Sequence, residues 1–219
     1  MHNWELHWLE AEGSLQDWRG VISEKIAAAS TAVSRLVPSS HLDILVQQGS
    51  EVIPQMGLVC FTNRKSLFSL VIEPENPNFA ASLADGTITR MVVHEVHHCL
   101  RMAVTGYGRT LGDALVSEGL AGHFVRALMG NPPEPWERAV SLEELKQHLP
   151  EDDQLASTDY DHESWFFGAA GPRPMWLGYT LGYEVVRAWV RKKQPQDAET
   201  WTSVLTEEVL SVGMRELRG

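Results

Sequence analysis

A run of ionisable residues interrupts the most apolar segment of the chain. Residues 87–103 carry apolar side chains on nearly every side of a predicted helix, which is typical of a helix buried in a core. The same segment contains His-Glu-Val-His-His at residues 94–98, so three imidazoles and a carboxyl group are predicted to be buried together. Burying such groups is costly without a partner, and a metal ion is one common partner. A buried helix that carries polar chemistry is therefore the first requirement on the fold.

The spacing within this run suits a pair of metal ligands. Residues i and i+4 of a helix lie one above the other, so His94 and His98 can present imidazole nitrogens to one ion. Zinc is the metal that imidazole and carboxylate ligands favour in a tetrahedral site. Glu95 lies about 100° round the helix from His94, where it reaches a metal-bound water without being a ligand. We expect zinc to lower the pKa of that water towards about 7 and Glu95 to accept its proton.

A third ligand is predicted nineteen residues beyond His98. Residues 110–113, Thr-Leu-Gly-Asp, resemble a capping box that begins a second helix, and Glu118 lies on that helix. Small residues surround this glutamate: Ala114, Ser117, Gly119, Ala121 and Gly122. They would let the second helix approach the first closely, as a glutamate that reaches the same ion requires. Two histidines and a glutamate leave the fourth zinc position to water, which is the arrangement of a catalytic site.

Other interpretations of these residues are open. The chain has nine histidines in 219 residues, so His-Glu-x-x-His can arise by chance in an apolar helical protein that binds no metal. In that case Glu118 is a solvated helix residue and the neighbouring glycines serve packing. Two glycines within one helix argue against this, because each costs up to about 1 kcal/mol relative to alanine unless something requires it.

Charge and composition limit the partners of the protein. Eighteen Lys and Arg against twenty-nine Asp and Glu give a net charge of −11 without a basic run, so nucleic acid is not an expected partner. No stretch has the roughly 18 to 20 apolar residues that span a bilayer, and residues 1–13 do not resemble a signal peptide. Cys60 and Cys99 are too few for a disulfide framework. We expect a soluble cytoplasmic protein with no membrane partner.

The pattern along the chain predicts an α+β fold in one domain, residues 1–219. A helix is predicted over 15–37. Three short apolar runs are expected to form a small, mainly antiparallel sheet because their connections are short: 42–46, 56–61 and 67–72. The sheet packs on the helix at 87–103, and a helical lobe follows, with long helices near 175–193 and 200–217. The turn residues at 131–135 mark the boundary of this lobe.

These motifs together resemble a known family. The histidine pair followed after nineteen residues by Glu118 has the spacing of the gluzincin metallopeptidases, the thermolysin-like branch of the zincins. Residues 71–78, 115–121 and 178–183 are more closely similar to a family of predicted zinc-dependent proteases of unknown substrate. The resemblance covers about residues 40–190. It implies a zincin-like fold and a zinc ion (Zn2+) bound by His94, His98 and Glu118, with Glu95 as general base.

The resemblance has one further implication for the fold, and the chain departs from the family pattern at one position. It implies that strand 67–72 is the sheet edge above the active-site helix, where an extended peptide pairs, although the residues alone suit a core strand equally well. Gluzincins often carry an acid four residues after the glutamate ligand, where it orients a ligand histidine, and this chain has Gly122 there. Either zinc is held less firmly or another acid substitutes, with Asp113, Asp161 and Glu163 as candidates.

The remaining role is to donate a hydrogen bond to the oxyanion of the tetrahedral intermediate. Tyr179 and Tyr183 are spaced i, i+4 on a predicted helix, and His162 lies in an acidic segment before it. We choose Tyr179, although a tyrosine pair at this spacing also suits core packing. The ring of His97 projects about 100° away from that of His98, so we expect it to pack or to support the ligands.

The sequence thus predicts a zinc metallopeptidase that hydrolyses a peptide or protein substrate with a metal-activated water and Glu95 as general base. The alternative is a non-catalytic zinc-binding regulatory or interaction module of the same fold, which the glycine at 122 keeps open. The substrate, endo- or exopeptidase action and the oligomeric state do not follow from the sequence.

Overall fold

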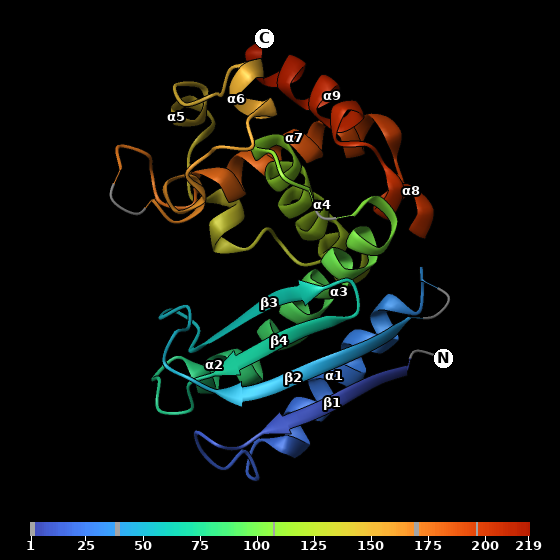
Figure 1. The fold of residues 1–219 in the computed structure, drawn as a ribbon, viewed down its shortest axis with the longest axis vertical. Helices are drawn as coiled ribbons and strands as arrows, with labels where there is room; N and C mark the ends of the chain where they lie inside the picture. The colour runs from blue at the N-terminus through green and yellow to red at the C-terminus, as the bar shows by residue number, and fades with distance from the viewer. Residues whose placement is uncertain (1–2, 38–39, 107, 169–170, 196) are drawn as a thin grey trace. The chain divides into compact units, whose positions relative to one another are not determined.

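The structure is a computed structural model that describes residues 3–37, 40–106, 108–168, 171–195 and 197–219 (Figure 1). The chain divides into two compact units, residues 1–103 and 104–219. The boundary falls in the last turn of the helix that contains His-Glu-x-x-His. The expectation of one domain with a lobe boundary at 131–135 stays a prediction.

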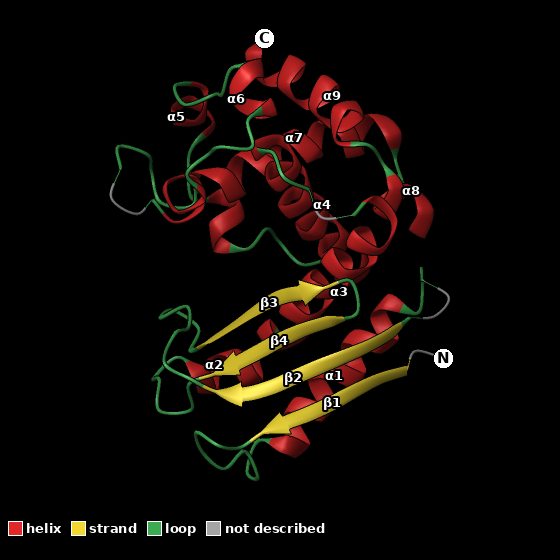
Figure 2. Ribbon diagram, viewed as in Figure 1, coloured by secondary structure: helices red, strands yellow, loops and turns green. Residues whose placement is uncertain are grey.

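The first unit is built on a four-stranded sheet (Figure 2). Its strands are β1 (Asn3–Leu9), β2 (His41–Gln48), β3 (Leu58–Arg64) and β4 (Leu67–Ile72), in the order β1-β2-β4-β3. β1 and β4 both pair with β2 in parallel, and only the β3–β4 hairpin among these pairs is antiparallel. The prediction of a mainly antiparallel sheet was therefore wrong. Helix α1 (Arg19–Val33) connects β1 to β2, and a helical crossover of this kind joins parallel strands.

Strand β1 was missed by the sequence analysis, although its pattern is visible in the sequence. Residues 3–9 alternate strictly between polar and apolar side chains until Leu9, and their exposure alternates with the same period of two. Such alternation is the signature of a half-buried strand.

Strand β4 is internal, which corrects a second expectation. It lies between β2 and β3, and its last five residues are buried. The strand is therefore a core strand, as the residues alone allowed, and not the sheet edge that the resemblance implied. The edges of this sheet are β1 and β3.

The core of the first unit lies between the sheet and three helices on one of its faces (Figure 2). These helices are α1, α2 (Phe79–Ala84) and α3 (Thr87–Thr105). Alternate residues of the central strands and the apolar stripes of the helices supply fully buried side chains: Ile22, Ile44, Val46, Phe68, Leu70, Ile88, Val92 and Val96. The burial of α3 agrees with its nearly uniform apolar composition. Packing of α3 against the sheet also fixes the position of the histidine motif.

The second unit is helical. Its elements are α4 (Leu111–Met129), η1 (Pro135–Arg138), α5 (Leu142–Lys146), α6 (Asp152–Ala156), η2 (Glu163–Phe167), α7 (Leu177–Lys193), α8 (Ala198–Ser203) and α9 (Thr206–Arg218). The predicted capping box at the start of α4 is confirmed, since Thr110 Oγ1 accepts from the Asp113 N–H and Asp113 Oδ2 accepts from the Thr110 N–H, both at 3.1 Å. The single helix predicted near 200–217 is two helices, because the backbone is extended at Val204 and Leu205.

Helices α4 and α7 cross at two glycines. A Cβ on Gly119 would overlap the carbonyl oxygen of Gly182, and a Cβ on Gly182 would overlap that of Leu115. The small residues near Glu118 therefore do permit a close approach of two helices, as expected. For Gly119 the neighbour is α7, whereas the sequence analysis had assumed the histidine helix.

His123 reinforces the same crossing. Its ring is 6% exposed and stacks on Tyr183, with the ring centroids 4.0 Å apart, and its Nε2 lies 3.0 Å from the Tyr183 carbonyl oxygen. Burial lowers the pKa of His123 to about 4, and Arg126 and Arg187 act in the same direction against the hydrogen bond to Tyr183. The imidazole is therefore neutral in the folded protein at pH 7 and donates to that carbonyl.

The free energy of unfolding should consequently fall as the pH drops from 6.5 towards 4. In this range the unfolded chain takes up a proton on His123 that the folded chain does not, which costs about 1.4 kcal/mol per pH unit. Chemical denaturation at several pH values measures the slope. His123→Gln keeps a donor for the carbonyl but does not titrate, so its slope should be smaller; equal slopes would contradict this assignment.

Candidate metal centre

The two histidines of the motif face each other on α3. Their Nε2 atoms lie 3.0 Å apart, and their ring centroids are 4.7 Å apart. His94 is 9% exposed and His98 is half-buried. Two ring nitrogens this close together on adjacent turns can reach one ion, as the i, i+4 spacing predicts.

A carboxylate completes a group of three possible ligands. His94, His98 and Glu118 each offer one ligand atom, and these atoms lie within 4.8 Å of one another, so the group could hold a metal ion. Two imidazole nitrogens and one carboxylate oxygen are ligands that catalytic zinc sites use. The donor set of this group therefore fits zinc.

Glu95 is hydrogen-bonded to the sheet. Its side chain is 5% exposed, and its Oε2 accepts a 2.8 Å hydrogen bond from Oγ1 of Thr62 on β3. A carboxylate fixed beside a ligand histidine by another residue suits a proton acceptor better than a ligand. His97 is fully buried, with its ring centroid 6.2 Å from that of His98, in agreement with packing or support of the ligands.

A second group of ligand-type side chains among the described residues lies on the neighbouring strands β1 and β2. It consists of Glu5, His7 and Asp43. His7 Nε2 already pairs with Asp43 Oδ1 at 2.7 Å, and both side chains are more than 40% exposed. An exposed hydrogen bond between these two side chains accounts for the arrangement.

Comparison with known proteins identifies the family. A family model described as "Predicted Zn-dependent protease (DUF2268)" matches residues 22–211, which is most of the chain. The chain belongs to this family. The match includes α3, α4 and α7, and it confirms the resemblance to zinc-dependent proteases of unknown substrate. Comparisons with curated proteins and with solved structures gave no match, so the zincin-like fold stays a prediction.

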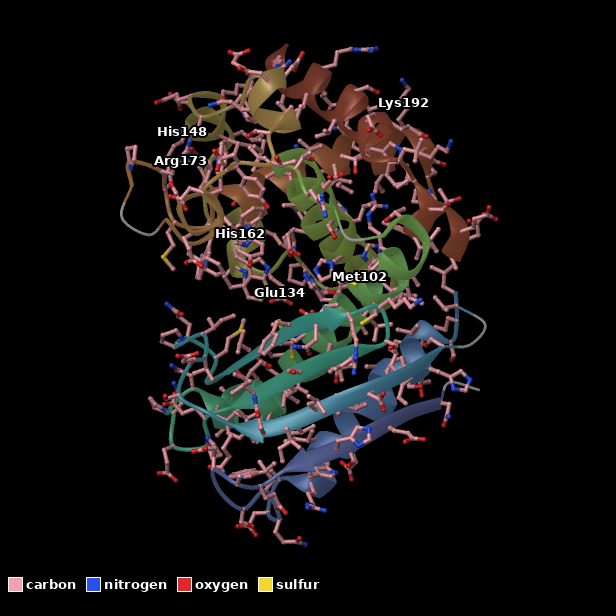
Figure 3. All side chains as sticks on the ribbon, in the orientation of Figure 1. Met102, Glu134, His148, His162, Arg173 and Lys192 are labelled. Carbon is pink, nitrogen blue, oxygen red and sulfur yellow. The ribbon has the colours of Figure 1, made fainter. Side chains whose placement is uncertain are left out.

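In this member of the protease family, a carboxylate from outside α4 occupies the place next to Gly122. A Cβ on Gly122 would overlap Oε1 of Glu137, whose side chain is 5% exposed. The other oxygen, Oε2, accepts a 2.7 Å hydrogen bond from the N–H of Glu134, which is labelled in Figure 3. Glu137 thus places a carboxylate directly beside residue 122.

The acids that the sequence analysis considered for this role have other positions. Asp113 accepts hydrogen bonds from Thr110 at the start of α4 and from Thr206 at the start of α9. Asp161 is exposed and accepts from the N–H of Ser164, and Glu163 is exposed at the start of η2. Sequence reasoning missed Glu137 because no fixed spacing relates it to residue 122. The only signal was the glycine itself, which leaves room for a side chain from elsewhere.

The three candidates for the oxyanion donor have different surroundings in the structure. Tyr183 is 3% exposed and stacked on His123, and burial raises its pKa, so it belongs to the core of the second unit. Tyr179 is half-buried, with its ring 5.1 Å from that of Phe166. His162, labelled in Figure 3, is exposed and stacks on the same phenylalanine at 4.5 Å. Tyr179 and His162 therefore share one aromatic cluster, and the choice of Tyr179 stays a prediction.

None of the described helices combines the length and the apolar composition that crossing a bilayer requires.

Proposed function

We propose that the protein is a zinc-dependent peptidase of the gluzincin type, which hydrolyses peptide bonds in a peptide or protein substrate. The observation that carries the proposal is the ligand group His94, His98 and Glu118 in a chain that belongs to a family of predicted zinc-dependent proteases. These three side chains would hold the ion. Bound zinc supplies Lewis acidity, which polarises the substrate carbonyl and acidifies a water molecule.

Glu95 carries out the proton transfer in this proposal. Its carboxylate takes a proton from the attacking water and passes it to the leaving amine. Adjacency to His94 on α3 and the hydrogen bond from Thr62 support this role, because both limit the positions that the carboxylate can adopt. Tyr179, half-buried within its aromatic cluster, is the proposed donor to the oxyanion.

Edge strand β3 is the proposed binding place for an extended substrate. It forms one edge of the sheet, and it carries Thr62, which contacts Glu95. A peptide that added a strand to this edge would run beside the general base, with main-chain hydrogen bonds that do not depend on its sequence. This assignment replaces the edge at 67–72 that the resemblance implied.

Metal removal and a ligand variant test the proposal. A chelator should abolish cleavage of a mixed peptide library, and added zinc should restore it. Glu118→Gln removes the charged ligand. It should weaken zinc binding by more than the roughly 10- to 100-fold that is lost when a residue hydrogen-bonded to a metal ligand is removed. Zinc competition with a chromogenic chelator measures the affinity.

The matched control is Glu207→Gln, the same change at an exposed position on α9. It should bind zinc and cleave peptides like the wild type. Unchanged zinc affinity in Glu118→Gln would overturn the ligand assignment. Zinc binding without cleavage of any peptide by the wild type would instead favour the non-catalytic zinc-binding module.

A further inference from the structure

A threonine hydroxyl lies against the carboxylate of Glu95. Thr62 Oγ1 is 2.8 Å from Glu95 Oε2 and 3.2 Å from the backbone oxygen of the same residue. The carboxylate is 5% exposed and the threonine is half-buried, so little water competes for this contact. A hydrogen bond to a charged acceptor at this distance is among the stronger ones in proteins.

The alternation of buried and exposed residues along β3 places the Thr62 side chain on the buried face of the strand. Leu58 and Cys60 are buried, and Thr62 is the next residue on the same face of the strand. A polar side chain thus stands where the pattern of the strand calls for an apolar one. The register with β4 shifts between Thr62 and Arg64, and such irregularities often re-aim side chains near functional sites.

Cys99 adds a third group to this contact. It lies four residues after Glu95 on α3, and its Sγ is 3.8 Å from Thr62 Oγ1 and 3.5 Å from the Arg64 carbonyl oxygen. Thr62 Oγ1 is much nearer to Glu95 Oε2, at 2.8 Å, than to this sulfur, and a carboxylate oxygen is a stronger acceptor than a thiol. The hydroxyl proton of Thr62 therefore goes to the carboxylate.

We propose that Thr62 is a positioning residue for the general base: its hydroxyl fixes one carboxylate oxygen of Glu95 and leaves the other to accept the proton of the attacking water. The proposal rests on the proposed peptidase function. A carboxylate free to rotate would spend part of its time turned away from the water, and loss of orientation lowers the rate of proton transfer. The simpler role for Thr62, attachment of β3 to α3, predicts a loss of stability in place of a loss of rate.

Three variants separate these roles. Thr62→Val keeps the shape of the side chain and removes the hydroxyl, whereas Thr62→Ser keeps the hydroxyl. Thr89→Val is the matched control, because it removes another threonine hydroxyl, bonded to the Lys25 carbonyl oxygen, from α3 itself. For Thr62→Val we expect kcat to fall about 10-fold or more, the worth of a hydrogen bond to a charged group, with KM and zinc affinity unchanged and a loss of melting temperature similar to that of Thr89→Val. Thr62→Ser and Thr89→Val should retain the kcat of the wild type.

Crystal structures of the zinc-loaded variants provide a readout that needs no turnover. The Glu95 carboxylate should leave its position in Thr62→Val and keep it in Thr62→Ser. An unmoved carboxylate, or an equal fall of kcat in Thr89→Val, would overturn the positioning role. Cleavage by the wild type together with an unchanged kcat in Thr62→Val would overturn this role alone. Absence of cleavage by the wild type would remove the proposed function as well.

Discussion

Replacing Glu95 with glutamine should abolish peptide hydrolysis and leave zinc binding intact. Glutamine has nearly the same shape, and its amide oxygen can still accept the hydrogen bond from Thr62, so the fold around position 95 is preserved. It cannot accept a proton from water. General base catalysis contributes typically 10²- to 10⁴-fold, and kcat should fall by about that factor. Metal analysis and cleavage of a mixed peptide library at equal protein concentrations check both parts.

Glu75→Gln is the control for this experiment, because Glu75 is exposed in the same unit. It should match the wild type in zinc content and in cleavage. Equal cleavage by wild type and Glu95→Gln would eliminate Glu95 as general base. Loss of zinc from Glu95→Gln would place this carboxylate among the ligands, contrary to its contact with β3.

The helices of the candidate centre could be predicted because their signals are local. The apolar composition of 87–103 indicated a buried helix, and α3 is buried along most of its length. The Thr110–Asp113 capping box located the start of α4 to the residue. Since helical geometry fixes the spacing of side chains, His94 and His98 could be expected to face each other, and their Nε2 atoms do.

The sheet could not be predicted to the same depth because strand pairing is non-local. Short connections suggested antiparallel neighbours, but β2 is followed by β3 and pairs with β4 and β1. Parallel pairing with β1 depends on α1 as a crossover, and β1 itself went unrecognised. The order of strands decides which one is the edge, so the proposed substrate strand moved from 67–72 to β3.

The residues that surround the proposed ligands and base were the hardest to predict. Thr62 reaches Glu95 from strand β3, and Glu137 reaches Gly122 from the short helix η1. Neither pair has a spacing that periodicity could reveal, because each depends on how separate elements pack. In the sequence, Gly122 stood where an acid was expected. In the structure, the absence of a side chain at Gly122 leaves room for the carboxylate of Glu137.

Replacing Gly182 with alanine should destabilise the second unit by more than the roughly 1–3 kcal/mol typical of overpacked cores. The added Cβ would overlap the Leu115 carbonyl oxygen, while Gly119 packs its own backbone against Gly182 from the opposite helix. Both partners are main-chain atoms inside helices, so no change of rotamer relieves the overlap and α4 must move away from α7. Thermal unfolding followed by circular dichroism measures the loss.

Gly20→Ala shows what the same substitution does without an opposing backbone. Gly20 lies in the first turn of α1 with no atom of another element within 4 Å of an added Cβ, so alanine should be neutral or stabilise by up to about 1 kcal/mol through helix propensity. The contrast isolates the crossing of α4 and α7 as the cause. Because α4 carries Glu118, Gly182→Ala should also weaken zinc binding in the molecules that remain folded. A wild-type melting temperature for Gly182→Ala would contradict the close crossing, and the position of Glu118 would then have to be fixed by other contacts.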